Sequence, residues 1–177
     1  MTTFVDRFRS DFNFDAEMVT SGIFQGDILW RNHSGENVLW LMNNNRPSSI
    51  AALPSVTPDW HVKATANFDG DFGHEGILWQ NDNGALALWE VNETATVDAI
   101  HVLPNPGPTW HVVGDNDFNG DELDDILFQH DSGTLAIWTL NPATGTGRGH
   151  VRRYPESGSD LARGGDRRYG QHSCARR

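Results

Sequence analysis

The chain has 177 residues, with 24 acidic and 13 basic side chains and a formal net charge of −11. Hydrophobic residues make up 37% of it, which together with 18 glycines is the composition of a globular domain and not of a disordered chain. The acidic charge excludes general binding to nucleic acid or anionic membranes, because both need a basic surface, and it favours cations as partners. The single cysteine, Cys174, excludes an intrachain disulfide and a cysteine-based zinc site.

No apolar run is long enough to span a bilayer, so we expect no membrane insertion. The first residues also lack the apolar stretch of a secretory signal. The sequence therefore indicates a cytosolic chain, a chain exported by another route, or a fragment.

The charge is divided unevenly along the chain. Residues 1–147 hold 21 acidic and 5 basic residues, a net charge of −16, whereas residues 148–177 hold 3 acidic and 8 basic residues, a net charge of +5. Together with the repeats described next, this break divides the chain into a degraded N-terminal segment (1–21), a repeat region (22–147) and a basic tail without repeats (148–177).

A short apolar block occurs three times at a step of 49 residues. It reads Asp-Ile-Leu-Trp-Arg-Asn at 27–32, Gly-Ile-Leu-Trp-Gln-Asn at 76–81 and Asp-Ile-Leu-Phe-Gln-His at 125–130. The same step relates two further sets of residues, which are Gly35, Gly84 and Gly133, and Trp40, Trp89 and Trp138. Three copies in one register identify an internal repeat.

A second block occurs twice at a step of 50 residues: Leu-Pro at 53–54 and 103–104, and Trp-His-Val at 60–62 and 110–112. Short alternating apolar runs, separated by Gly- and Pro-containing turns, predict strands near Ile77, Leu88, Ile100 and His111 and no helix. The sequence Asp-Asn-Gly at 82–84 predicts a hairpin. A period of this length with four strands predicts an all-β fold, a partial β-propeller of about three four-stranded blades with an irregular or disordered C-terminal tail.

Two residue types recur within this register. We interpret the repeated Trp residues as packing between blades, with stacking against a sugar as the alternative. His61 and His111 share one repeat position, which favours a structural role over metal binding or catalysis. His74 and His130 have no repeated partner and no visible catalytic triad.

The clearest chemistry lies in residues 117–125, Asp-Phe-Asn-Gly-Asp-Glu-Leu-Asp-Asp. Oxygen-bearing side chains fall at the first, third, fifth and ninth positions, and a backbone carbonyl at the seventh can complete the six to eight oxygens that Ca²⁺ prefers. Asp124 is expected to point outward. The predicted ligands of this stronger loop are Asp117, Asn119, Asp121, Leu123 (by its carbonyl) and Asp125. A solvated acidic turn without bound metal is the alternative.

A weaker copy precedes it at residues 67–76, with one extra residue before the next strand. Its first carboxylate is replaced by an amide and its last ligand is a longer Glu, so we expect lower affinity or no binding. The predicted ligands of this weaker loop are Asn67, Asp69, Asp71, Gly73 and Glu75. Residues 11–15 repeat only the beginning of the loop, and no clear ninth-position ligand follows them.

The loop Asp-Phe-Asn-Gly-Asp followed by Asp-Ile-Leu, with the Leu-Trp and Trp-His-Val strands, resembles the FG-GAP or VCBS repeat over roughly residues 22–141. That family is known for calcium-binding propeller blades, as in the integrin α-chain and many exported bacterial proteins. The resemblance implies a secreted or cell-surface location and about seven blades in a complete ring. Glu122 stands where the family usually has Gly, so the loop is strained if this position needs a positive φ.

The basic tail carries a trace of the repeat in another reading frame. With permitted codons, residues 153–168 read one base later give Val-Ile-Pro-Asn-Pro-Gly-Pro-Thr-Trp-His-Val-Val-Ala-Thr-Gly-Asp. Ten consecutive residues of that translation match residues 104–113, at an offset of 51. A frameshift between about Gly145 and Arg152 explains the match better than a functional basic tail does.

Three functions agree with these observations. The leading hypothesis is a non-catalytic calcium-binding segment of a larger exported or surface protein, which binds a glycan or a protein in adhesion. The second is an accessory or catalytic propeller of a carbohydrate-active enzyme, although no nucleophile elbow, zinc triad or phosphate loop is present. The third is a truncated gene product without independent function. Three blades leave open strand edges, so we also expect self-association.

Overall fold

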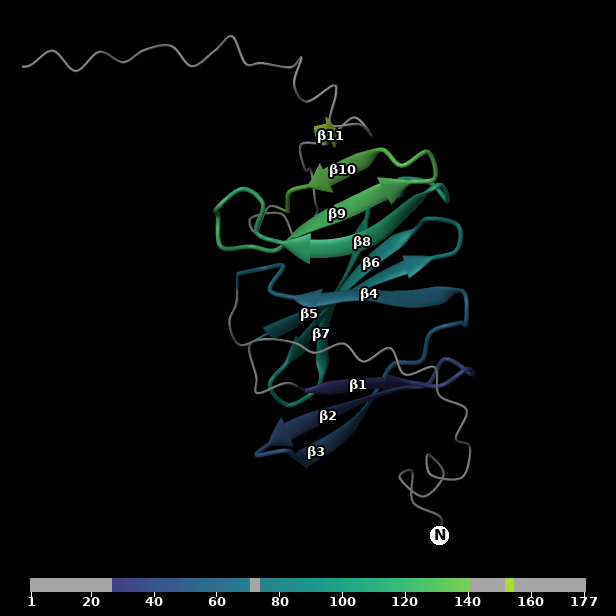
Figure 1. The fold of residues 1–177 in the computed structure, drawn as a ribbon. Coiled ribbons are helices and arrows are strands. Elements are labelled where there is room, and N and C mark those ends of the chain that lie inside the picture. The colour runs from purple at the N-terminus through teal and green to yellow at the C-terminus, as the bar shows by residue number, and fades with distance from the viewer. Residues whose placement is uncertain (1–26, 71–73, 141–151, 155–177) are drawn as a thin grey trace, which may run out of the picture.

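The computed structural model describes residues 27–70, 74–140 and 152–154, and these residues are all-β (Figure 1). The described part contains no helix, and therefore none long and apolar enough to cross a membrane. The strands form three antiparallel sheets. Sheet 1 contains β1 (Ile28–Arg31), β2 (Asn37–Asn43) and β3 (Arg46–Leu53). Sheet 2 contains β4 (Trp60–Ala66), β5 (His74–Asn81), β6 (Leu86–Asn92) and β7 (Val97–Leu103). Sheet 3 contains β8 (Trp110–Asn116), β9 (Asp125–His130), β10 (Leu135–Trp138) and β11 (Arg152–Tyr154).

Residues that are 49 positions apart in the sequence occupy the same place in the strand pairing of successive sheets. Ile28 pairs with Trp40 in sheet 1, Ile77 with Trp89 in sheet 2, and Ile126 with Trp138 in sheet 3. The hairpin that these two strands form, here named the central hairpin, is therefore built from the same residues of the repeat in all three sheets. The predicted Asp-Asn-Gly hairpin joins β5 to β6, and its Gly84 has a φ of 88°.

Sheet boundaries do not coincide with the four strands that the sequence suggested for one unit. The strand of His111, β8, pairs with β9 of the following sheet and not with β7. Likewise, β4 pairs with β5. The chain crosses to the next sheet in the Pro-containing segments after Leu53 and Leu103, since these segments form no hairpin that would keep the next strand in the same sheet.

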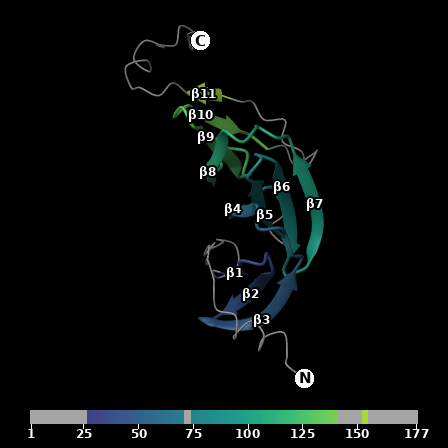
Figure 2. The same ribbon diagram turned by 90° about the vertical axis from the view of Figure 1, so that its right-hand side faces the viewer.

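The three sheets stack face to face in chain order (Figure 1). Figure 2 shows them as a curved fan, with β3 and β7 along its outer side. As described, the fan does not close into a ring.

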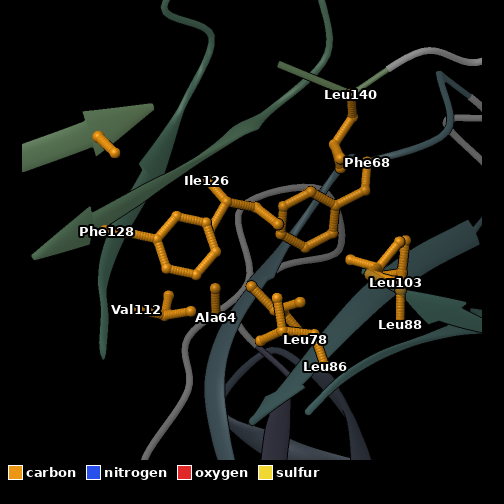
Figure 3. Packing of buried hydrophobic residues seen from close by; sticks show 11 residues of the cluster. Ala64, Phe68, Leu78, Leu86, Leu88, Leu103, Val112, Ile126, Phe128 and Leu140 are labelled. Atoms are coloured by element: carbon orange, nitrogen blue, oxygen red, sulfur yellow. The ribbon is translucent and has the colours of Figure 1, made fainter. Parts of the chain in front are cut away.

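Two apolar clusters hold the stack together. The first lies between sheets 1 and 2 and contains Trp79 and Trp89, which are 1% and 4% exposed. This burial confirms the packing role expected for these two tryptophans. The second cluster lies between sheets 2 and 3, where Phe128 and Ile126 face Leu78 and Phe68 (Figure 3).

The expectation of a tail without strands needs a correction. Residues 152–154 form β11, which pairs antiparallel with β10, and Leu135 is opposite Tyr154. An edge strand needs only backbone hydrogen bonds to one neighbour, so a segment without alternating apolar residues can still complete the sheet. The other tail residues, and the N-terminal segment 1–21, lie outside the described part.

Candidate calcium loops

The stronger loop joins β8 to β9 and is organised around the carboxylate of Asp117. Its Oδ1 accepts the backbone N–H groups of Asn119 (3.2 Å), Gly120 (2.6 Å) and Asp121 (3.3 Å), and its Oδ2 accepts that of Glu122 (3.0 Å). These bonds, with that of Gly120 first, hold the pKa of Asp117 below its usual value. The loop therefore turns around an ionised carboxylate.

The middle of the loop is tied by two further contacts. Asn119 Nδ2 donates to Asp121 Oδ2 at 2.9 Å, and the N–H of Leu123 donates to Asp121 Oδ1 at 3.1 Å. The Leu123 side chain is 3% exposed, so the loop buries its seventh residue. The third, fifth and seventh positions thus belong to one compact turn.

Asp125 closes the loop from the first position of β9, where it is fully buried. Its Oδ2 accepts the N–H of Phe118 at 3.1 Å, and its Oδ1 accepts that of Leu140 at 3.1 Å. Burial raises the pKa of Asp125, these two N–H groups lower it, and the charges of Asp121 and Asp117 raise it further. The carboxylates of Asp121 and Asp117 are therefore close enough to Asp125 to repel it.

Asp124 does not point outward as expected. Its Oδ2 accepts the N–H of Asn67 at 3.0 Å, and its own N–H donates to the carbonyl of Asn67 at 2.9 Å. This pair of bonds ties the stronger loop to the weaker one in the preceding sheet. Burial and the nearby charge of Asp124 also raise the pKa of Asp115 on β8.

The weaker loop follows β4 and differs from the stronger one at its end. Asn67 is 7% exposed, and its Oδ1 accepts the N–H of Gly70 at 2.9 Å. Gly76 pairs with Ala66 in sheet 2, and Asp125 pairs with Asn116 at the same place in sheet 3. Gly76 is therefore the counterpart of Asp125, and Glu75 is the counterpart of Asp124. Asp71 and Gly73 lie outside the described residues, and Asp69 is half-buried.

No carboxylate fits at Gly76. A Cβ atom there would lie 2.5 Å from Cδ2 of Phe68, a contact too short for real side chains. Phe68 is 3% exposed in the core between sheets 2 and 3. The weaker loop therefore exchanges the buried aspartate of the stronger loop for apolar packing.

The buried aspartate has a second copy that sequence reasoning missed. Asp27 precedes β1 and is 4% exposed, and its Oδ1 accepts the N–H of Met42 at 2.7 Å. Leu140, which donates to Asp125, lies 98 residues after Met42, and Asp125 lies 98 residues after Asp27. The repeated Asp-Ile-Leu was the available signal for this shared role, which needs no metal.

The stronger loop offers oxygen donors, which are the type of ligand that a hard cation prefers. Carboxylate and amide oxygens with no thiolate or imidazole among them are the ligands that Ca²⁺ selects. In the described ranges, no ion pair to a basic side chain offsets Asp117, Asp121 or Asp125. Those same ranges hold no group of three or more His, Cys, Asp or Glu side chains already arranged around one metal position. The donor set therefore fits Ca²⁺, and in this structure its carboxylates accept hydrogen bonds from backbone N–H groups.

Two histidine–carboxylate pairs recur with the repeat. His61 Nε2 lies 2.8 Å from Asp82 Oδ1, and His111 Nε2 lies 2.7 Å from Asp131 Oδ1. Each pair joins the first strand of a sheet to its central hairpin, a contact that agrees with the structural role expected for these histidines. A third pair, His101 with Glu90 at 2.7 Å, joins β7 to β6.

No protein-family model matches this chain, and no curated protein matches it either.

Proposed function

We propose that this chain is a non-catalytic, calcium-binding segment of a β-propeller built from FG-GAP or VCBS repeats. Antiparallel sheets that stack face to face in chain order, the second and third entered through their Trp-His-Val strands, support this architecture. We place the segment in a larger secreted or cell-surface protein, where it binds a glycan or a protein in adhesion.

The observation that carries the calcium proposal is the crowding of acidic groups in the stronger loop. Asp125 is fully buried, its pKa is raised first by burial, and Asp121 and Asp117 add repulsion. A divalent cation would remove this repulsion, whereas a solvated acidic turn leaves it without a compensating positive charge. Asp117, Asn119, Asp121 and Asp125 would hold the ion by side chain, and Leu123 by its carbonyl.

The test measures thermal unfolding of the full chain with millimolar Ca²⁺ and with chelator. A ligand that binds only the folded state stabilises it by about 2.7 kcal/mol at 100 times its Kd. We expect Ca²⁺ to raise the Tm by several degrees and Asp121→Ala to abolish the shift.

The matched control is Asp131→Ala, which removes one carboxylate from the same sheet outside the loop. It breaks the contact with His111 and can lower the basal Tm, but the calcium shift should persist. Equal melting curves for the unmodified chain in calcium and in chelator would refute the calcium proposal.

The binding role has its own test. A glycan screen that records both retention and turnover distinguishes a lectin-like module, which leaves its ligand intact, from a carbohydrate-active enzyme. Retention without new reducing ends supports the binding role, and turnover by the purified chain contradicts it.

A further inference from the structure

A cavity of about 250 Å³ lies between sheets 1 and 2. Sheet 1 contributes Asp27, Leu39 and Leu41 to its wall, and the end of β6 contributes Val91, with Glu93 in the turn that follows. No side chain in its lining is aromatic or basic. An apolar wall with a few polar groups is the usual form of a small-molecule site.

Between sheets 2 and 3, a phenylalanine ring fills the space beside Gly76 of β5. Phe68 is 3% exposed and belongs to the same buried cluster as Leu88 and Leu140 (Figure 3). Its ring lies so close to the backbone that a Cβ atom added to Gly76 would be 2.5 Å from Cδ2 of Phe68. This interface therefore holds an aromatic ring against one glycine and two leucines.

The cavity occupies the same place in the repeat as the space that holds Phe68. Asp27, Leu39 and Val91 lie 49 residues before that glycine and those two leucines, in the same order. Leu39 is 8% exposed and Val91 is 2% exposed, so both form an apolar wall. An apolar cavity of about 150 Å³ binds benzene, so the larger space here accommodates an aromatic ring with a short side chain.

Charge distinguishes the cavity from the space that Phe68 fills. Asp27 stands where the other space has a glycine, and it is 4% exposed. Within the described residues its Oδ1 accepts the N–H of Met42 and its Oδ2 accepts nothing, whereas both oxygens of Asp125 accept an N–H. Glu93 adds a second, exposed carboxylate at the rim. A buried carboxylate oxygen without a donor is unfavourable, so the cavity favours a ligand with a cationic donor.

We propose that this cavity binds a small arylalkyl ammonium ion, which is an aromatic ring joined by a short carbon chain to a protonated amine. The ring packs against Leu39 and Val91, as Phe68 packs between sheets 2 and 3. The ammonium group donates to Asp27, and Glu93 adds attraction at the rim. The cavity and the calcium loop between β8 and β9 belong to different sheets, so this inference depends on neither calcium nor glycan binding.

Calorimetric titration of the full chain with phenethylammonium chloride tests the proposal. Two comparison ligands each carry half of its chemistry: phenylpropionate has the ring with a negative charge, and ethylammonium has the positive charge without a ring. We expect saturable binding of phenethylammonium, roughly tenfold tighter than binding of either comparison ligand. Absence of saturable binding, or equal binding of phenylpropionate, would overturn the proposal.

Two charge variants locate the ammonium group. Asp27→Asn keeps an oxygen that can accept the N–H of Met42 and removes the charge, so we expect roughly tenfold weaker binding with little change in Tm. Glu93→Gln changes an exposed side chain and should weaken binding roughly threefold, which provides the test if Asp27→Asn does not fold. Unchanged affinity in the folded charge variants would contradict the proposed site.

Two further variants separate the cavity from the rest of the acidic surface. Leu41→Trp places a large ring in the cavity and should abolish binding, with circular dichroism as the check that it is folded. Glu36→Gln is the matched control, because it neutralises an exposed carboxylate of the same sheet outside the cavity and should leave the affinity unchanged. Binding that survives in folded Leu41→Trp, or that is lost in Glu36→Gln, would place the ligand elsewhere and refute the proposal.

Discussion

Glu122 has a backbone conformation that normally belongs to glycine. Its φ is 69°, in the turn where the FG-GAP resemblance led us to expect Gly, and its N–H donates to Asp117. A left-handed conformation costs a non-glycine residue about 1–2 kcal/mol. The carboxylate that closes the turn therefore holds Glu122 in a strained conformation.

We predict that Glu122→Gly raises the free energy of unfolding by about 1 kcal/mol, because the released strain exceeds the entropy that glycine adds to the unfolded chain. Glu122→Ala is the control, since it removes the same carboxylate and keeps the strain. Urea unfolding of the two variants in chelator measures the difference. Equal stability of Glu122→Gly and Glu122→Ala would show that charge, and not backbone strain, limits this loop.

Individual residues also show where sequence reasoning ends. Spacing alone placed Asp117, Asn119 and Asp121 in one turn, because contacts within a few residues follow from local geometry. Asp124 was expected to point to solvent, yet its partner is Asn67, 57 residues away in another sheet. Such a contact depends on how two sheets stack, which no local pattern states.

At the scale of elements, the central hairpins of sheets 1 and 2 pack closely on the crossover that leaves the sheet. A Cβ atom added to Gly84 would lie 2.3 Å from the carbonyl carbon of Gly107, and one added to Gly35 would lie 1.7 Å from the carbonyl oxygen of Val56. The repeated glycine therefore serves two needs, a positive φ and a close approach between backbones.

We predict that Gly84→Ala destabilises the chain by about 1–3 kcal/mol more than Gly107→Ala, because the first adds a backbone clash to an unfavourable φ. Gly107 has a φ of 97° with nothing within 4 Å of its added Cβ, so its variant measures the φ cost alone. Chemical denaturation of both variants gives the two free energies. If they are equally destabilised, the hairpin and the crossover are not in firm contact.

The strands themselves were largely predictable, because alternation and turn residues are local signals. Strands near Ile77, Leu88, Ile100 and His111 are all present as β5, β6, β7 and β8. The assignment of β8 to the following sheet was not predictable from the repeat period alone, because the period does not say which strand of the repeat is the first strand of a sheet. Strand pairing supplies that starting point, at the Trp-His-Val strand.

For the molecule as a whole, the repeat indicates how side chains divide between the two faces of a sheet, but it does not indicate what lies at the two ends of the stack. Alternation along a strand puts Leu and the following aromatic residue on opposite faces, and the burial of both at the two internal interfaces agrees with it. The short strand β11 carries no such alternation, and it was missed because an edge strand is specified by its neighbour's backbone. What surrounds sheets 1 and 3 in the assembled protein is likewise a property of partners and not of local sequence.

The register of β11 also bears on the origin of the tail. Tyr154 is opposite Leu135 as Leu103 is opposite Leu86, and each is followed by proline, Pro155 and Pro104. Tyr154 lies 51 residues after Leu103, and Pro155 lies 51 residues after Pro104. This is the offset at which the shifted reading frame reproduces residues 104–113. The edge strand therefore ends at the position where, in sheet 2, the chain crosses to the Trp-His-Val strand of the next sheet.

We predict that resequencing the DNA across the codons for residues 145–152 shows a one-base change that shifts the reading frame. The restored frame should continue into another acidic loop and another Ile-Leu-Trp strand. A chain expressed in that frame should unfold at higher temperature than the present one, because a fourth sheet would cover Leu127 and Ile137 as sheet 3 covers Leu78 and Leu88. A downstream sequence without repeats would contradict the frameshift and return the basic tail to consideration as a segment in its own right.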